Sequence, residues 1–242
     1  MYAARTMQHY FATIDTLNDF SELLKYSAQV CREMGVIRQS YHLTPQFDSP
    51  NSTRVAVYAD GFSEEWLELY DEADFRRSDP IPGRVMRAGT ILKWTDAMKA
   101  GPNTADNIAY FKAMKKEGLI HGFGIPLFGP RGRDAYASFD FGIPLEDVAQ
   151  ENIGTVRAVP QAAHQKLSIL LDSMAIEPEL SERELEVLQW MTRGKSMAAT
   201  ALILDLSRDT VKTYVKRIYA KLEVSDRVGA TVSALKLGLI QI

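Results

Sequence analysis

The chain has 242 residues, of which 46% are apolar and 24% charged, close to the averages for soluble globular proteins, so disorder over most of its length is excluded. It has no run of about eighteen apolar residues and no basic start followed by an apolar stretch, so we expect neither a membrane-spanning helix nor a secretion signal. The net charge of −3 divides into −5 before Glu179 and +2 from there onward, which indicates a local anion-binding surface near the C-terminus.

Residues 1–172 are predicted to form a mixed domain of helices and strands. Apolar residues at helical spacing, with capping residues and terminal glycines, predict helices at 19–34, 63–75, 80–87, 105–117 and 145–174, and Pro160 is where the last of these would bend. Strands are expected at 36–43, 53–58, 122–128 and 134–142, with a polar turn at 45–52 and a tight turn at 129–132.

After a linker at residues 173–179, every predicted segment of residues 180–242 is helical. Ser181 and Glu184 form a capping box that begins the first helix, and Gly194 ends it. A short helix at 197–204, a tight turn at 206–207, a third helix that Ser207 caps, and a fourth helix at 226–236 follow. This order predicts a four-helix unit with a short helix, a turn and a longer helix at its centre.

The third of these helices has one apolar and one basic face. The apolar residues recur at helical spacing and should face a core: Val211, Val215, Ile218 and Leu222. A short helix, a tight turn and a capped basic helix form a helix-turn-helix, whose second helix fits the major groove of DNA, although a solvated helix in an ordinary bundle has the same pattern. The candidate DNA-binding residues are Ser207, Arg208, Thr210, Lys212, Thr213, Lys216, Arg217 and Lys221.

Residues 180–242 resemble the LuxR-type DNA-binding domain. The resemblance rests on motifs in the same order and spacing: Leu180 to Leu188, Gly194-Lys195-Ser196, Ile203-Leu204, Leu206-Ser207, Thr210-Val211-Lys212, Lys221-Leu222 and Gly238-Leu239-Ile240. In the family, Lys212 and Lys216 match positions of base-contacting residues, so we expect them to read bases while Arg208, Arg217 and Lys221 hold phosphates. The chain departs from the family at Ala199 and Tyr214, where we expect altered packing and intact DNA binding.

The N-terminal region resembles a known type of ligand-binding domain. Phosphorylation-controlled response regulators carry the same C-terminal domain, but the early acidic residues of this chain belong to helices, which excludes a receiver domain. Instead, Trp66-x-x-x-Tyr70, Asp79-Pro80, Trp94 and Gly122 match the spacing of the autoinducer-binding domain of LuxR-type quorum-sensing receptors. This resemblance implies an α+β chain: an α-β-α sandwich with an antiparallel sheet, followed by the four-helix helix-turn-helix domain.

The same resemblance implies a site for an N-acyl-homoserine lactone. Trp66 would donate its indole N–H to the lactone carbonyl, and Asp79 would accept the amide N–H. Tyr70 and Trp94 would pack over the acyl chain and the lactone ring. Taken singly, the three aromatic residues also fit a core, and Asp79 fits a cap for the helix after it.

Two positions of this expected site differ from the family. Phe62 stands where the family usually has a tyrosine whose hydroxyl donates to the acyl carbonyl, so Ser138 or a water would take that role. Ile81 stands where relatives often have threonine, which suggests a drier wall.

We therefore expect a cytoplasmic homodimer that senses a lactone, binds a palindromic promoter site and contacts RNA polymerase. Residues 1–172 would bind the ligand and would dimerise through an apolar stripe on their last helix. The alternative interpretation is that this stripe covers the sheet. The stripe consists of Val148, Val156, Val159, Ala163, Leu167, Leu170 and Met174, aided by Ala230, Ala234 and Leu237 of the last helix.

No catalytic, metal or cofactor site is expected. A Gly-x-Ser-x-Gly elbow is absent, Gly122-x-Gly124 lacks the third glycine of a dinucleotide loop, and Arg131 and Arg133 fit a solvated hairpin tip. Cys31 is the single cysteine and fits a reducing compartment, and the four histidines lack zinc-ligand spacing. The alternatives are a regulator that senses another small molecule and, from another class, a lactone hydrolase with a DNA-binding tail.

Overall fold

The computed structural model of the chain describes residues 6–43, 56–73, 75–174 and 178–240, so the predicted turn at 45–52 lies outside the described residues. The chain divides into two compact units, Met1–Ser173 and Met174–Ile242, each of which is described below by itself.

The N-terminal unit contains a five-stranded antiparallel sheet in the order β2-β1-β5-β4-β3. Its strands are β1 (Arg38–Leu43), β2 (Ala56–Asp60), β3 (Leu92–Lys93), β4 (Phe123–Leu127) and β5 (Ala135–Asp140). The central strand β5 is buried at every position, and successive side chains of each strand point to opposite faces of the sheet. The sheet therefore separates two cores.

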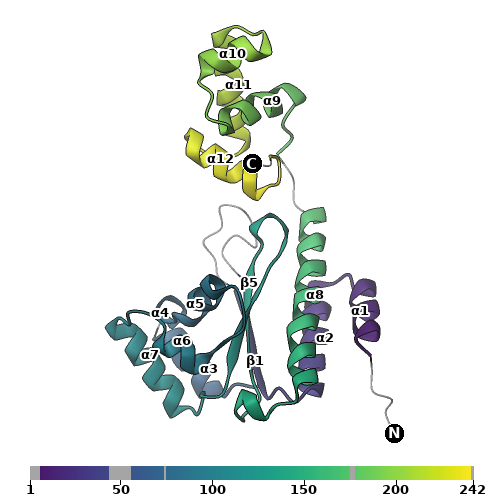
Figure 1. The fold of residues 1–242 in the computed structure, drawn as a ribbon, viewed down its shortest axis with the longest axis vertical. Helices are drawn as coiled ribbons and strands as arrows, with labels where there is room; N and C mark the ends of the chain where they lie inside the picture. The colour runs from purple at the N-terminus through teal and green to yellow at the C-terminus, as the bar shows by residue number, and fades with distance from the viewer. Residues whose placement is uncertain (1–5, 44–55, 74, 175–177, 241–242) are drawn as a thin grey trace. The chain divides into compact units, whose positions relative to one another are not determined.

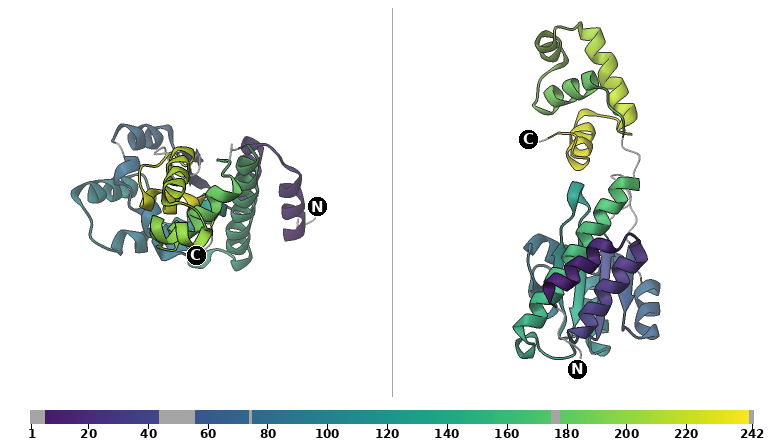
Figure 2. Two further views of the ribbon diagram at one scale, coloured as in Figure 1. Left: turned by 90° about the horizontal axis from the view of Figure 1, so that it is seen from above. Right: turned by 90° about the vertical axis from the view of Figure 1, so that its right-hand side faces the viewer.

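Helices cover both faces of this sheet, which confirms the predicted sandwich (Figure 1). One face carries α2 (Phe20–Glu33) and α8 (Gln150–Met174), with α1 (Met7–Thr16) packed on α2, as the further views also show (Figure 2). The other face carries α3 (Glu64–Glu72), α4 (Phe75–Ser78), α5 (Ile81–Ala88), α6 (Trp94–Lys99) and α7 (Ala105–Lys116).

Local capping explains where the predicted helices begin and end. The Asp19 carboxylate accepts the Glu22 backbone N–H at 2.9 Å and begins α2, and Gly89 in the left-handed region ends α5. The elements α1, α4, α6 and β3 were not predicted; α4 has four residues and β3 has two, too few for a hydrophobic period to be recognised.

The apolar stripe of α8 faces the sheet, so the alternative interpretation of this stripe is correct. Val156 and Val159 are fully buried, and Val148, Ala163 and Leu167 belong to the same core. Leu170 packs against that core, and the side chain of Met174 lies outside the described residues. This stripe therefore cannot serve as the dimer interface expected from the sequence.

The prediction of a solvated Arg133 is also wrong. Arg133 is 7% exposed and donates to the Ser168 carbonyl of α8 at 3.2 Å, while its own carbonyl contacts Nε2 of His164 at 2.6 Å. On its other side, the His164 ring contacts the Tyr41 hydroxyl of β1. Gly129 lies so close that a Cβ atom there would meet the Arg133 carbonyl at 2.4 Å. These contacts join the hairpin between β4 and β5 to α8.

The C-terminal unit consists of the predicted helices, α9 (Glu182–Thr192), α10 (Met197–Leu204), α11 (Arg208–Lys221) and α12 (Arg227–Lys236). The capping box at Ser181 and Glu184 is present. Ala230 and Ala234 of α12 are fully buried in the core of this unit, so the expectation that they contact a second copy is wrong. Leu237 is partly buried against the same core. The exposed apolar face of α12 instead carries Val228, Val232 and Leu235.

Candidate functional site

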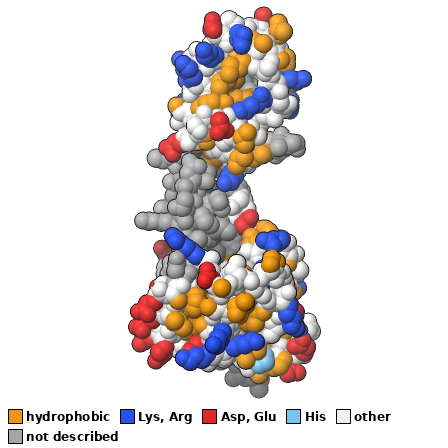
Figure 3. Space-filling model, turned by 90° about the vertical axis from the view of Figure 1, so that its left-hand side faces the viewer, with side chains coloured by type: hydrophobic (Ala, Val, Ile, Leu, Met, Phe, Trp, Pro, Cys, Tyr) orange, Lys and Arg blue, Asp and Glu red, His pale blue; other side chains and the backbone are white. Residues whose placement is uncertain are grey.

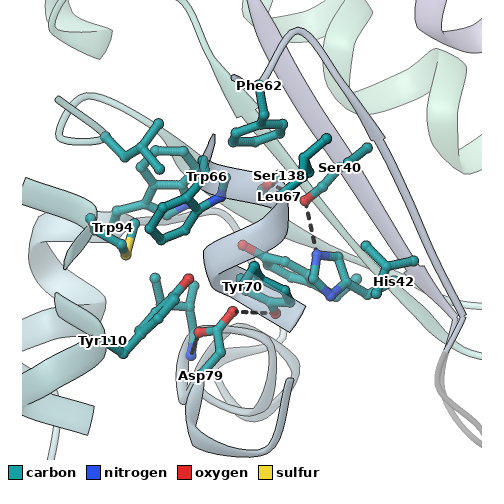
Figure 4. A pocket seen from close by; sticks show the side chains of 16 residues that line it. Ser40, His42, Phe62, Trp66, Leu67, Tyr70, Asp79, Trp94, Tyr110 and Ser138 are labelled. Carbon is teal, nitrogen blue, oxygen red and sulfur yellow. Dashed lines mark hydrogen bonds between the residues drawn. The ribbon is translucent and has the colours of Figure 1, made fainter. Parts of the chain in front are cut away.

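A pocket with a cavity volume of about 50 Å³ lies between the sheet and helices α3, α5, α6 and α7 of the N-terminal unit (Figure 4). All six residues that the sequence proposed for ligand binding line it: Phe62, Trp66, Tyr70, Asp79, Trp94 and Ser138. They come from separate segments between residues 62 and 138, and the fold brings them to one cavity.

Helix α3 supplies the aromatic wall of the pocket. The Ser63 hydroxyl caps this helix by accepting the Trp66 backbone N–H at 3.2 Å, which fixes the first turn. Trp66 and Tyr70 are four residues apart and so share one face of the helix, with ring centroids 6.0 Å apart. Both rings also contact Tyr110 of α7, which sequence reasoning placed in a helix without identifying it as a pocket residue.

Hydrogen bonds hold the Asp79 carboxylate in the pocket. Its Oδ1 accepts the Ile81 backbone N–H at 2.8 Å, at the first turn of α5, and its Oδ2 accepts the Tyr70 hydroxyl at 3.3 Å. The carboxylate thus binds the first backbone N–H of α5 and lines the pocket at once, while the N-cap residue of this helix is Pro80. Burial raises the pKa of Asp79 to about 7, although the bonds from Ile81, Tyr110 and Tyr70 favour the ionised form.

Trp94 forms the wall beside Gly122. The Trp94 backbone N–H donates to the Gly122 carbonyl at 2.8 Å, and the indole lies so close to this glycine that a Cβ atom there would meet the ring at 2.5 Å. The indole of Trp94 therefore leaves no room for a side chain at residue 122. The indole Nε1 is buried and has no hydrogen-bond partner within the part of the chain that the structure describes.

The floor of the pocket is the inner face of the sheet. Ser40 of β1 pairs with Ser138 of β5, and His42 pairs with Tyr136, so two cross-strand pairs lie next to each other on this face. The Ser40 hydroxyl is 2.7 Å from the Ser138 hydroxyl and 2.9 Å from Nε2 of His42. Sequence reasoning missed Ser40, His42 and Tyr136; the alternation along β1 was their only signal.

A second candidate surface lies on α10 and α11 of the C-terminal unit. Asp205, with a φ of 53°, turns the chain between the two helices. The Ser207 hydroxyl then accepts the Thr210 backbone N–H at 3.0 Å and begins α11. Val211, Val215 and Ile218 are buried as expected. This arrangement is the helix-turn-helix that the sequence predicts.

The proposed DNA-binding side chains of α11 are exposed with one exception, Thr210, which is partly buried. The exposed ones are Arg208, Lys212, Thr213, Lys216, Arg217 and Lys221. On the face of the C-terminal unit that Figure 3 shows, lysine and arginine side chains lie around apolar side chains.

Lys221 differs from the other exposed side chains because it has partners within the protein. Its ammonium donates to the buried Glu184 carboxylate at 2.7 Å and to the Glu179 carbonyl at 2.7 Å. These bonds tie the end of α11 to the start of α9, and they compete with the phosphate contact that the sequence predicts for Lys221.

Among the described residues, no group of three or more His, Cys, Asp or Glu side chains could hold a metal ion. In the same part of the chain, no helix is both long and apolar enough to cross a membrane.

Comparison with known proteins identifies the family. Residues 19–167 match the autoinducer binding domain, and residues 178–234 match the luxR family of bacterial regulatory proteins. The chain is 30% identical to the quorum sensing-dependent regulator RpaR of Rhodopseudomonas palustris over 76% of this chain and 75% of RpaR. It is also 30% identical to the regulator y4qH of Sinorhizobium fredii, over 79% of this chain but only 58% of y4qH.

The fold is similar to that of SdiA from Escherichia coli. The crystal structure of SdiA superposes with a TM-score of 0.74 at 21% identity, over 97% of this chain and 98% of SdiA. A structure of SdiA in complex with octanoyl-rac-glycerol superposes with a TM-score of 0.69 at 19% identity. Members of the matched families are transcriptional regulators and not enzymes, and they bind autoinducers as effectors, not cofactors. The chain thus belongs to the LuxR family of transcriptional regulators, with an N-terminal autoinducer-binding domain and a C-terminal helix-turn-helix that binds DNA.

Proposed function

We propose that the autoinducer of this regulator is an N-acyl-homoserine lactone and that it binds in the pocket between the sheet and α3. The observation that carries this proposal is the buried Asp79 carboxylate among aromatic rings. A carboxylate in such surroundings favours a ligand that donates a hydrogen bond to it, because an unpaired buried charge is costly. The amide N–H of an acyl-homoserine lactone is such a donor, and the apolar remainder of the wall suits its acyl chain.

The other pocket residues take roles that match the chemistry of the ligand. The Trp66 indole N–H donates to the lactone carbonyl, and Trp94 packs against the lactone ring. Tyr70 packs along the acyl chain while its hydroxyl orients the Asp79 carboxylate. The Ser138 hydroxyl donates to the acyl carbonyl in place of the hydroxyl that Phe62 lacks.

A thermal-shift experiment on the full-length protein tests the proposal. N-butanoyl-, N-octanoyl-, N-dodecanoyl- and N-benzoyl-homoserine lactone are added at increasing concentration. A ligand that binds only the folded chain stabilises it by about 2.7 kcal/mol at a hundredfold excess over its Kd, so Tm should rise. The control variant Asp79→Ala should lose about 1–3 kcal/mol of binding free energy. An unchanged Tm with every lactone contradicts the proposal.

The alternative effector is a small molecule of another class. The SdiA structure with octanoyl-rac-glycerol motivates this comparison, because that ester has hydroxyl groups and no amide N–H. Octanoyl-rac-glycerol is therefore added to the same panel. Stabilisation by this ester and by none of the lactones would favour the alternative and would remove the role of Asp79 as an amide acceptor.

We also propose that two copies of the chain bind a palindromic promoter site and act there with RNA polymerase. The support for two copies is the apolar face of α12, where Val228 is 73% exposed and Val232 45%. A second copy that covered this face would present two copies of α11 to the two halves of a palindrome. Sedimentation of the lactone-bound protein should give a dimer, and Val228→Asp combined with Val232→Asp should give a monomer that keeps lactone binding. A monomer with the native face would refute dimerisation.

A further inference from the structure

Three polar side chains on the floor of the pocket form a continuous chain of hydrogen bonds. Ser138 is bonded to Ser40 across the two strands, and Ser40 is bonded to Nε2 of His42 two residues further along β1 (Figure 4). Ser40 and Ser138 are 8% and 3% exposed, so water contributes little at either hydroxyl. The family resemblance assigned no role to Ser40 or His42.

The number of hydrogen atoms in this chain restricts what Ser138 can do. Each serine hydroxyl has one hydrogen to donate, and a neutral imidazole carries its hydrogen on either Nδ1 or Nε2. If Nε2 of His42 has no hydrogen, Ser40 must donate to His42, and Ser138 must then donate to Ser40. Ser138 would in that case have no hydrogen left for a ligand oxygen. If Nε2 carries a hydrogen, His42 donates to Ser40 and Ser40 donates to Ser138. The Ser138 hydroxyl then keeps its own hydrogen for the ligand or for the Tyr136 hydroxyl, with which it is also hydrogen-bonded.

The place of Ser138 in the pocket makes this donor useful. Figure 4 shows Ser138 and Ser40 beside Phe62, the residue that lacks the hydroxyl expected at this point. The neighbours of the serine pair in the same row of the sheet are Ala59 and Gly124, and Ala59 lines the pocket together with both serines.

We propose that His42 is a positioning residue which, by donating from Nε2 to Ser40, holds the Ser138 hydroxyl as the hydrogen-bond donor for the acyl carbonyl of the ligand. The inference rests on the proposed lactone function and adds the residue that sets the direction of the hydrogen bond. The rings of Tyr136 and Tyr70 meet the imidazole edge-on, with centroids 5.1 and 6.5 Å away, and so hold it in place.

A pair of isosteric substitutions separates the direction of hydrogen bonding from the shape of residue 42. In His42→Gln the amide N–H can donate to Ser40, whereas in His42→Glu an ionised carboxylate can only accept. The probe is the lactone that raises Tm most in the four-member panel, and its Kd is measured by calorimetry on the full-length protein. We expect His42→Gln to bind within about threefold of wild type and His42→Glu to bind at least about tenfold more weakly than His42→Gln.

The same pair in a Ser40→Ala background provides the control. Without the Ser40 hydroxyl the chain is interrupted, so the difference between Gln and Glu should fall to about twofold or less. A difference that persists would come from the charge of Glu alone and would overturn the proposal, as would equal binding of the two single variants. If no lactone of the panel binds wild type, the proposed function fails instead, so the two failures are distinguishable.

Nitrogen NMR of ¹⁵N-histidine-labelled full-length wild type gives a second measurement that does not depend on the folding of His42→Glu. The His42 signals are assigned by their loss in His42→Gln. In the lactone complex Nε2 of His42 should be protonated, and an unprotonated Nε2 in that complex would refute the proposal.

Discussion

Lactone binding should depend on pH through the carboxyl group of Asp79. In the unliganded pocket burial raises the pKa of this group to about 7, so a large part of the population is protonated near neutral pH. A protonated carboxyl can still accept a hydrogen bond, but the ionised form accepts the ligand's amide N–H far more strongly. Binding should therefore favour the ionised form and release a proton.

The size of the effect follows from the ionised fraction. With a pKa of about 7 in the free protein, the carboxylate fraction is about one-tenth at pH 6 and about three-quarters at pH 7.5. If the complex holds the ionised form at both pH values, Kd should fall about eightfold between them, which corresponds to about 1.2 kcal/mol. Calorimetry in buffers with different ionisation enthalpies should show close to one proton released per ligand at pH 6.

Asp79→Asn is the matched variant for this prediction. The amide can still accept the ligand N–H but does not titrate, so the pH dependence due to Asp79 should disappear. The lactam analogue of the ligand controls for opening of the lactone ring at the higher pH. A wild-type Kd that changes less than twofold, or an equal slope in wild type and Asp79→Asn, would refute the reasoning.

Three further predictions concern other parts of the chain. Lys212→Ala should cost about 1–3 kcal/mol of binding free energy on a cognate duplex and reduce discrimination against a scrambled duplex, as measured by fluorescence anisotropy. Arg217→Ala should weaken binding to both duplexes equally and lower the log–log salt slope of binding by about one unit. Lys221→Met should lower the free energy of unfolding by about 1–2 kcal/mol in a denaturant titration, because Glu184 loses its partner. The log–log salt slope of DNA binding should change little in this variant. A salt slope reduced by one unit would show that Lys221 contacts a phosphate. Burial lowers the pKa of His164 to about 4, so the folded state binds fewer protons than the unfolded chain between about pH 6.5 and 4. The free energy of unfolding should therefore fall as the pH decreases through this range. If it depends on pH equally in wild type and His164→Gln, this prediction is wrong.

The parts of the fold that local chemistry determines were predictable. The capping residues Ser181 and Ser207 lie three residues before the N–H groups that they accept, so the helices of the C-terminal unit could be located from short stretches of sequence. The same holds for Asp19 and Ser63 in the N-terminal unit. The pocket residues were found through their spacing, which the family resemblance supplied.

The parts that depend on distant segments were not predictable in the same way. An apolar stripe shows that a helix face is buried but not what buries it, and so Val156 of α8 and Ala230 of α12 turned out to face the core of their own unit. Arg133 follows a turn of glycine and proline, which is typical of an exposed tip, and only the arrival of α8 some thirty residues later buries it. The register between β1 and β5 placed Ser40 opposite Ser138, and no local pattern determines that register.

The polar groups of the pocket connect ligand recognition to the stability of the N-terminal unit. A pKa of about 7 for Asp79, against about 4 in an unfolded chain, means that folding without ligand costs up to about 4 kcal/mol above neutral pH, and the cost is absent below pH 4. The buried Trp94 Nε1, which has no partner within the described residues, adds a further cost. A ligand that supplies an N–H to the carboxylate and an oxygen to the indole can reduce both free-energy costs. A protein of ordinary stability has only about 5–15 kcal/mol in total, so a pocket with these costs makes the folded population sensitive to the ligand. On the proposed function, Asp79→Asn should therefore raise the Tm of the free protein while reducing the further increase that the lactone produces.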